Sequence, residues 1–289
     1  RYAMLGQAAV RDEGCGDFGS GVICKIAGKY DISDNIGIRA SFNTGFRAPT
    51  PGQQGTTNVS TRLPNGVPVA TGLFPASGPI AKALGAEDLA PETSEGLSVG
   101  LVGNIGPIDF TIDYYTIDIE DYFSAVSERD VSTDPTDAAA YENFLALDSA
   151  GVVGANTIGS VFFFTNAYDV NVSGVDAVVT YPIESDLGTT DITFTYGFTE
   201  FEFDSDPSGF LNEEDQFDEE NFDPNTRAIL QIRHRWEDYA VLLRTSYWGE
   251  SENYQSGNVQ DFDPVGMTDL QLTYFGEDFS LTMGGMNVF

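Results

Sequence analysis

The sequence predicts an all-β protein, a transmembrane antiparallel up-and-down β-barrel with short helices in its extracellular loops. Three observations lead to this fold class. Apolar and polar residues alternate with a period of two, short and long connections alternate along the chain, and aromatic residues gather beside the short connections. A soluble β-sandwich shows the same alternation, but it needs neither aromatic residues at one end nor long loops on one side only.

Eleven segments carry the alternation. In chain order, strands are expected over residues 1–10, 21–31, 36–46, 94–104, 107–119, 172–183, 189–203, 226–236, 239–250, 265–276 and 279–289. In the fifth segment, for example, Ile108, Phe110 and Ile112 alternate with Asp109 and Thr111. One face of each strand is therefore apolar and the other is polar, as a wall between lipid and a wet lumen requires.

The connections differ in length in a regular way. Short turns are expected at 31–35, 104–106, 184–188, 237–238 and 276–278, and long loops at 11–20, 47–93, 120–171, 204–225 and 251–264. Loops longer than about 15 residues are uncommon in compact soluble domains. The stretch FNTGFRAPTPGQQ shows how a strand gives way to such a loop, because Gly45 and Pro49 interrupt regular pairing.

Two loops contain helix signals. In loop 120–171, Asp134 can cap a helix that has Pro135 in its first turn, runs from Ala138 to Leu147 and ends at Gly151. In loop 47–93, a second short helix is expected over 79–84, and Asn65-Gly66 predicts a hairpin turn.

The charge of the chain limits its partners. The formal net charge is −32, with 45 acidic and 13 basic residues, so nucleic acid is not expected to bind. Loop 204–225 is a flexible acidic loop in this interpretation. It either solvates the surface and attracts cations or holds Ca²⁺, although it lacks the EF-hand spacing. The calcium candidates are Asp204, Asp206, Glu213, Glu214 and Asp215.

Few residues suit catalysis. The one histidine, His234, lies on an apolar strand face beside Trp236, where contact with lipid is expected. With a single histidine and two cysteines, neither a Ser-His-Asp triad nor a zinc site is expected, so an enzyme is not predicted. Cys15 and Cys24 flank a glycine-rich turn and are either a disulfide of an oxidising compartment or two free thiols.

Four arginines fall on the polar parity of their strands, which would place them in the lumen of a barrel, where a charge is tolerated. They are Arg39, Arg227, Arg233 and Arg244.

Several stretches, in the same order along the chain, resemble one family. They are Asp17-Phe18-Gly19-Ser20, Ile38-Arg39-Ala40-Ser41, Thr44-Gly45-Phe46-Arg47-Ala48-Pro49, Leu89-Ala90-Pro91-Glu92-Thr93-Ser94, Asp113-Tyr114-Tyr115, Ile117-Asp118-Ile119, Asn171 to Gly174-Val175-Asp176, and Gly284-Gly285-Met286-Asn287-Val288-Phe289. The chain resembles the C-terminal part of the barrel of a TonB-dependent outer-membrane receptor over nearly its whole length.

The resemblance implies a location and an activity. Such receptors place a plug domain inside a barrel of about 22 strands in the bacterial outer membrane. They bind a scarce nutrient, such as a siderophore, cobalamin, a metal complex or an oligosaccharide, and import it with energy from the TonB–ExbB–ExbD complex. The expected partners are this complex, acting through the plug, together with outer-membrane lipid and lipopolysaccharide. We expect residues 1–289 to be about eleven strands of the barrel, without the plug and the final strand.

The site of ligand binding would be the extracellular vestibule. Its candidates are Arg47, Gln53, Gln54, Tyr141 and Phe144, although Arg47 equally suits an ion pair with a carboxylate at the rim. Two other functions remain open at this point. One is a passive porin of the same barrel class, and the other is a secreted acidic β-sandwich that binds carbohydrate.

Overall fold

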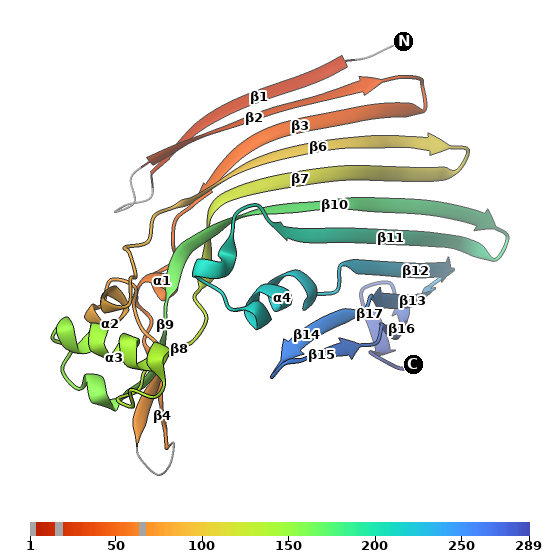
Figure 1. Cartoon of the computed structure of the whole chain (residues 1–289). Coiled ribbons are helices and arrows are strands. Elements are labelled where there is room, and N and C mark those ends of the chain that lie inside the picture. Colours follow the sequence, from red (N-terminus) through yellow and green to blue (C-terminus); the bar gives the residue numbers. More distant parts are fainter. Residues whose placement is uncertain (1–3, 15–19, 64–67) are drawn as a thin grey trace.

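The wall of the molecule is one antiparallel sheet of eleven strands, in the order in which the chain runs. The computed structural model describes residues 4–14, 20–63 and 68–289. The strands of the wall are β1 (Met4–Gly14), β2 (Ser20–Asp31), β3 (Ile36–Arg47), β6 (Glu92–Ile105), β7 (Ile108–Ala125), β10 (Phe164–Ser185), β11 (Gly188–Phe203), β12 (Thr226–Trp236), β13 (Tyr239–Trp248), β16 (Val265–Phe275) and β17 (Ser280–Gly285). Figure 1 shows a long curved sheet with its short turns at one end and its long connections at the other.

All eleven expected segments are strands of this sheet, so the predicted fold class is confirmed. The largest differences lie at the ends of β7 and β10, which continue as a pair beyond the predicted limits, to Phe164 opposite Ala125. The pairing is irregular between Asn166 and Val170, where two register shifts bend the ladder. This upper part of the pair has no regular alternation, which is why the sequence predicts shorter strands there.

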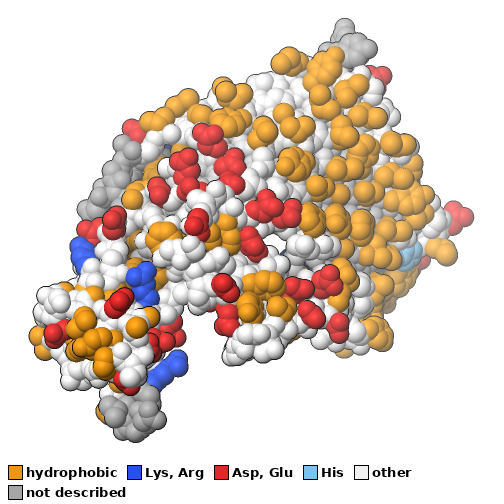
Figure 2. Space-filling view, in the orientation of Figure 1, with side chains coloured by type: hydrophobic (Ala, Val, Ile, Leu, Met, Phe, Trp, Pro, Cys, Tyr) orange, Lys and Arg blue, Asp and Glu red, His pale blue; other side chains and the backbone are white. Residues whose placement is uncertain are grey.

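One face of the wall is apolar and exposed. Ala40, Val99, Tyr114, Val175 and Phe198 form one row across five neighbouring strands. Val99 and Tyr114 are about half exposed, at 49% and 50%. Figure 2 shows hydrophobic side chains covering this face of the wall. Such a broad apolar surface is costly in water and suits lipid.

Aromatic residues mark the end of the wall that carries the short turns. The ring centroids of Trp236 and Tyr239 lie 5.8 Å apart, those of Tyr239 and Tyr274 5.1 Å, and those of Tyr274 and Phe279 5.9 Å. His234 stacks on Trp236 at 5.4 Å, and its Nδ1 lies 2.8 Å from the Thr190 hydroxyl. This row matches an aromatic girdle at a membrane interface.

The other face of the wall carries charges. Arg39, Gly100, Asp113 and Asp176 lie in one cross-strand row. Arg39 donates to Asp113 across β6, with 2.7 Å between Nε and Oδ1. Gly100 lies between them and has no side chain to obstruct the pair. The same row continues through Gly197 to Arg227.

Two long connections fold into one outer module, which we define as residues 48–91 and 126–163. It contains a four-stranded sheet of β4 (Asn58–Arg62), β5 (Val69–Leu73), β9 (Ile158–Phe162) and β8 (Arg129–Asp130). Its helices are α1 (Pro51–Gly55), α2 (Pro79–Ala83), α3 (Ala138–Ser149) and η3 (Ala155–Thr157). The parallel pairing of β5 with β9 joins the two connections.

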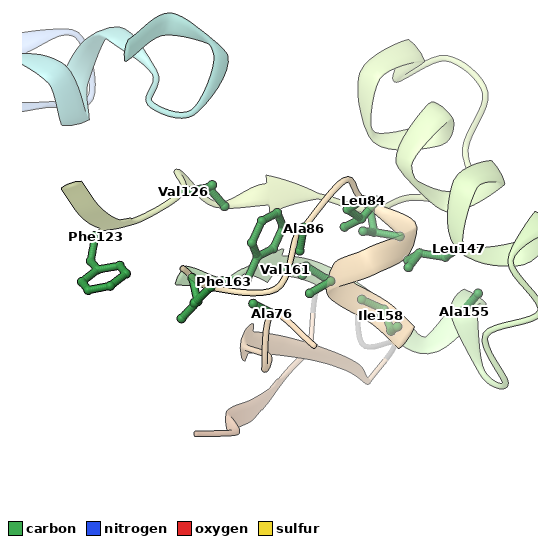
Figure 3. Packing of buried hydrophobic residues seen from close by; sticks show 13 residues of the cluster. Ala76, Leu84, Ala86, Phe123, Val126, Leu147, Ala155, Ile158, Val161 and Phe163 are labelled. Carbon is green, nitrogen blue, oxygen red and sulfur yellow. The ribbon is translucent and has the colours of Figure 1, made fainter. Parts of the chain in front are cut away.

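The outer module has its own hydrophobic core. Ala81, Leu147 and Val161 are fully buried, at 0% exposure, and come from α2, α3 and β9. Figure 3 shows side chains of both connections meeting in this cluster. The module is therefore held together in the way of a small soluble domain.

The helix predictions in the outer module are largely confirmed, with two corrections, the cap described next and Pro135, which lies in a turn before α3 and not in its first turn. Helix α3 begins at Ala138, but its cap is Asp137, whose side chain accepts from the Ala140 N–H at 3.3 Å. Asp134 instead accepts from the N–H and hydroxyl of Thr136, so the predicted cap at Asp134 is wrong. Helix α2 has Pro79 at its first turn, as expected. Asn65-Gly66 lies outside the described residues.

Two further long connections hold elements that the sequence does not predict. Connection 204–225 contains η4 (Pro207–Gly209) and α4 (Glu213–Asn221), and connection 249–264 contains a hairpin of β14 (Ser251–Gln255) and β15 (Asn258–Phe262). The acidic loop is thus helical, because Asn212 caps α4 and three acidic residues in its first turn favour its N-terminus. Within the described ranges, no helix has the length and apolarity needed to cross a membrane.

Candidate functional site

A cavity opens at the end of the wall that carries the long connections. Its volume is about 780 Å³, and it lies between the last residues of β7 and helix α4. Residues 124–128 and Phe162 line one side, while Leu211, Asn212, Phe222 and the inner face of α4 line the other. We call this space the acidic cavity, for the carboxylates described next.

Five carboxylates line the acidic cavity, namely Glu128, Asp215, Asp218, Glu219 and Asp223. None of the described lining residues is a lysine, arginine or histidine. The pKa of Glu219 is raised, first by partial burial and then by the negative charges of Asp215 and Asp223. The cavity is therefore strongly negative, and its own carboxylates repel one another.

Helix α4 is fixed on two sides. Ser127, just after β7, donates its hydroxyl to Asp215 and accepts the N–H of Asn212 at 2.8 Å. On the opposite side, Asp218 accepts from the Tyr254 N–H and from the Asn253 amide, both at 2.6 Å. The helix thus bridges β7 and the β14–β15 hairpin and forms a fixed wall of the cavity.

Aromatic rings lie beside the cavity. Tyr122 and Tyr168 stack with centroids 6.0 Å apart, and Phe203 meets Tyr168 edge-on at 4.8 Å. Tyr168 is 3% exposed, and Ser124, on the paired strand β7, is the polar side chain that acts on its hydroxyl.

Arg47 forms the rim contact that the sequence offers as one alternative. Its Nε lies 2.6 Å from Glu92 Oε1, and its terminal nitrogen donates to Oε2 at 2.9 Å. Glu92 also accepts the Phe123 N–H at 3.2 Å, and the guanidinium lies 5.3 Å from the Phe123 ring centre. Arg47 therefore ties the ends of β3, β6 and β7 together.

The other predicted vestibule residues lie on two helices of the outer module, α1 and α3. Gln53 and Thr50 form a capping box at the start of α1, while the Gln54 amide donates to the Pro49 carbonyl at 2.8 Å. Tyr141 and Phe144 lie on α3 with ring centroids 6.0 Å apart, and Phe144 packs on the core of the outer module. Their part in ligand binding stays a prediction.

The predicted calcium ligands lie on separate elements, and calcium binding stays a prediction. In the ranges that the structure covers, no group of three or more His, Cys, Asp or Glu side chains is arranged to hold a metal ion. Asp204 lies just after β11, Asp206 accepts from the Ser208 N–H, and Glu214 from the Gly257 N–H. Glu213, Glu214 and Asp215 lie in the first turn of α4, whereas Asp204 and Asp206 precede this helix.

The lumen candidates lie on the charged face of the wall. Arg39 pairs with Asp113, Arg244 donates to Asp269 at 3.1 Å, and Arg227 lies 5.3 Å from the ring centre of Trp248. Arg233 lines a cavity of about 310 Å³ near the short turns. Cys15 lies outside the described residues, so its disulfide with Cys24 stays a prediction. The Cys24 N–H donates to the Thr44 hydroxyl at 3.0 Å.

Two features at this end of the wall are not predicted from the sequence. Asn212 followed by Glu213-Glu214-Asp215 is a helix N-terminal signal that would have predicted α4 and thus the spacing of Asp215, Glu219 and Asp223. Tyr168 carries no such signal, because its burial depends on partners from β7 and β11.

The comparisons with known proteins agree with this architecture. Residues 17–288 match the family model described as "TonB dependent receptor-like, beta-barrel". A search of curated protein sequences found no match.

Solved structures share the fold. The siderophore receptor PirA from Pseudomonas aeruginosa superposes with a TM-score of 0.62 at 14% identity, over 99% of this chain and 42% of that one. A variant of the ferric enterobactin receptor from the same organism, in complex with enterobactin, gives 0.66 at 13% identity, over 99% and 38%. The ferripyoverdine receptor of its outer membrane gives 0.53 at 14%, over 93% and 29%.

At these identities the structural likeness shows the fold alone, and the chain spans about two fifths of the length of the first of these receptors. The family model, in contrast, covers nearly the whole chain. Its members are outer-membrane transport receptors and not enzymes, as the sequence predicts. This chain belongs to the TonB-dependent receptor-like β-barrel family of the outer membrane.

Proposed function

We propose that the chain is the C-terminal part of a receptor barrel that imports a small, scarce nutrient across the outer membrane. The observation that carries the proposal is the family match over residues 17–288, on a wall whose long connections build a vestibule at one end. The solved structures that the chain resembles are described as a siderophore receptor, a ferric enterobactin receptor and a ferripyoverdine receptor. The ligand class of this chain is a separate question.

The rest of such a receptor would supply the remaining strands and the plug. This division is supported by the coverage, since the chain accounts for only 42% of the siderophore receptor. In this proposal the charged inner face, with Arg39, Asp113, Asp176 and Arg227, contacts the plug. The TonB–ExbB–ExbD complex would act on the plug and not on the wall described here.

Uptake in cells tests the proposal. The full-length receptor would be produced in a bacterium that lacks its own outer-membrane receptors, with and without TonB. Accumulation of labelled ferric siderophores, cobalamin, oligosaccharides and cationic solutes would be measured. We expect saturable accumulation of one class that disappears without TonB or after collapse of the proton-motive force. Accumulation that is linear in concentration and independent of TonB would contradict the proposal and favour a porin.

A further inference from the structure

We propose that a pocket on the inner face of the wall, beside the short turns, is an anion site that binds a compact oxyanion, a carboxylate or phosphate group. Its volume is about 310 Å³, and we call it the basic pocket. The polar part of its lining consists of Arg233, Arg235, Gln271, Thr273, Ser280 and Thr282. The site goes beyond the proposed function, because it lies at the end of the wall opposite to the vestibule and does not depend on which nutrient is imported.

The basic pocket lies on the charged face of the wall. Arg235, Ala240, Thr273 and Thr282 form one row across β12, β13, β16 and β17. Arg233 is two residues from Arg235 on the same strand, so both guanidinium groups are on the same face. The intervening residue, the histidine that stacks on Trp236, is on the apolar face. The pocket is therefore on the lumen side of the wall and not on the lipid side.

The two arginines of the basic pocket have no carboxylate partner. Nearby on the same face, Arg244 forms an ion pair with Asp269. Within the described residues, the side chains of Arg233 and Arg235 take part in no ion pair or hydrogen bond, and no acidic residue lines the pocket. Asp191 lies opposite Arg233 on β11, but the two side chains are not paired. In a chain with 45 acidic and 13 basic residues, two neighbouring arginines without an acid leave a local positive charge.

The polar groups around the arginines supply further hydrogen-bond donors. Gln271 Nε2 donates to Thr273 Oγ1 at 3.3 Å, and the hydroxyl oxygens of Thr273 and Thr282 lie 3.0 Å apart. The bond between these two hydroxyls uses one of their two protons, so the other proton remains available for an acceptor. An oxyanion would thus meet both guanidinium groups and a hydroxyl donor, whereas a cation would find no negative group in the lining.

One guanidinium group is held in place by an aromatic ring. The guanidinium carbon of Arg235 lies 4.8 Å from the centre of the Phe275 ring, over its face. Contact with a ring face leaves the N–H groups at the edge of a guanidinium group free to donate, and their planar fork matches the oxygens of a carboxylate or phosphate. The volume of the pocket is at the lower end of the range of small-molecule sites, so it suits a compact anion.

The oxyanion has two possible sources with the same chemistry. One source is a free solute, such as citrate or inorganic phosphate. The other is an acidic side chain of the receptor outside residues 1–289 that faces the lumen. The two arms of the following experiment distinguish these sources.

Calorimetry on the purified full-length receptor in detergent tests the first source. Citrate and inorganic phosphate would be titrated at low salt, and we expect saturable binding of at least one anion that weakens as salt is raised. Arg233→Gln/Arg235→Gln should weaken this binding about tenfold or more. Arg233→Lys/Arg235→Lys keeps the charge but not the planar fork, so it should weaken binding less and serves as the check that the fold is retained.

The matched control is Arg62→Gln, which removes an exposed arginine from β4 in the outer module and should leave anion affinity unchanged. Anion binding that is equal in the parent receptor and in Arg233→Gln/Arg235→Gln would place the anion elsewhere and would overturn the proposal.

Zero-length cross-linking tests the second source. In the Arg233→Lys/Arg235→Lys receptor, a water-soluble carbodiimide would join an introduced amine to a carboxylate in contact with it, and mass spectrometry would locate the bond. A cross-link to an acidic residue outside residues 1–289 would show that the receptor supplies the oxyanion, whereas anion binding without that cross-link would show a free solute. A cross-link to Asp191 alone, or no cross-link, would overturn the proposal if neither anion binds.

Discussion

The wall and the outer module place their hydrophobic residues in opposite ways. In the wall, Val99 and Tyr114 face outward and stay about half exposed, while the inner face carries Arg39 and Asp113. In the outer module, Leu147 and Val161 are fully buried in one hydrophobic core. The wall depends on lipid as its apolar partner, and the module provides its own.

This difference separates two kinds of stability within one chain. Wall strands are held by continuous hydrogen-bonded ladders and by the surrounding lipid. The outer module is held by a core whose members come from two distant connections, joined through β5 and β9. A mutation in one region should therefore leave the other largely intact, and the following predictions test that independence from the largest expected effect to the smallest.

The largest effect is expected in the core of the outer module. Val161→Asp would bury an unpaired charge at a position with 0% exposure and should destabilise the module by about 3–5 kcal/mol. Limited proteolysis of the refolded full-length receptor should show cleavage within 48–91 and 126–163, with the wall intact. The control Val153→Asp, at 99% exposure, should leave the cleavage pattern unchanged. Loss of the wall together with the module would contradict their independence.

A smaller effect is expected on the lipid face. Val99→Arg places a charge in the middle of the outward apolar row and should cost about 2–4 kcal/mol of folding free energy in lipid vesicles. Ser98→Arg, one residue away on the inner face, should cost much less, because that side is wet. Equal costs, measured by urea titration, would contradict the assignment of the two faces.

The inner face offers a test of close approach. An added Cβ at Gly100 would lie 2.7 Å from Asp113 Cγ and 2.9 Å from the Ile112 carbonyl oxygen. Gly100→Ala should therefore displace the Asp113 side chain from Arg39 and cost about 1–3 kcal/mol. Gly28→Ala, whose nearest contact would be at 3.8 Å, is the matched control in the same wall. Equal unfolding midpoints of the Gly100→Ala and Gly28→Ala variants would contradict this prediction, because they would show that the Arg39–Asp113 pair tolerates the extra methyl group.

The smallest effect concerns the cap of α3. Asp137→Ala removes the side chain that accepts from the Ala140 N–H and should destabilise the module by about 1 kcal/mol. Asp134→Ala removes only the contact with Thr136 and should cost less. Hydrogen exchange at the first turn of α3 would distinguish the two variants. Faster exchange in Asp134→Ala than in Asp137→Ala would show that Asp134 is the cap, as the sequence predicts.

The same contrast explains what the sequence could predict. The alternation of Ile108, Phe110 and Ile112 is a local pattern, and it predicts the strands of the wall, their order and their two faces. The pairing of β5 with β9 joins residues about 90 positions apart, which no local pattern specifies. The outer module as a unit was therefore not predicted, although two of its helices were.

The candidate site was predicted less well than the fold. Arg47 and Glu92 form the rim contact that was one of two alternatives. The carboxylates of 204–225 are evident in the sequence, but their positions depend on α4 and on its contacts with Ser127 and Tyr254. Those contacts link three separate connections, so the acidic cavity became visible only in three dimensions.

The central claim is that lipid covers the apolar face of the wall, while water surrounds the outer module. The most direct measurement uses single cysteines at positions 99 and 153, with Cys15 and Cys24 replaced by alanine, labelled with bimane in the reconstituted receptor. Both parent residues are exposed valines, at 49% and 99%. We predict quenching by brominated lipid but not by aqueous iodide at position 99, and the reverse at position 153. The same response at both positions would contradict the account.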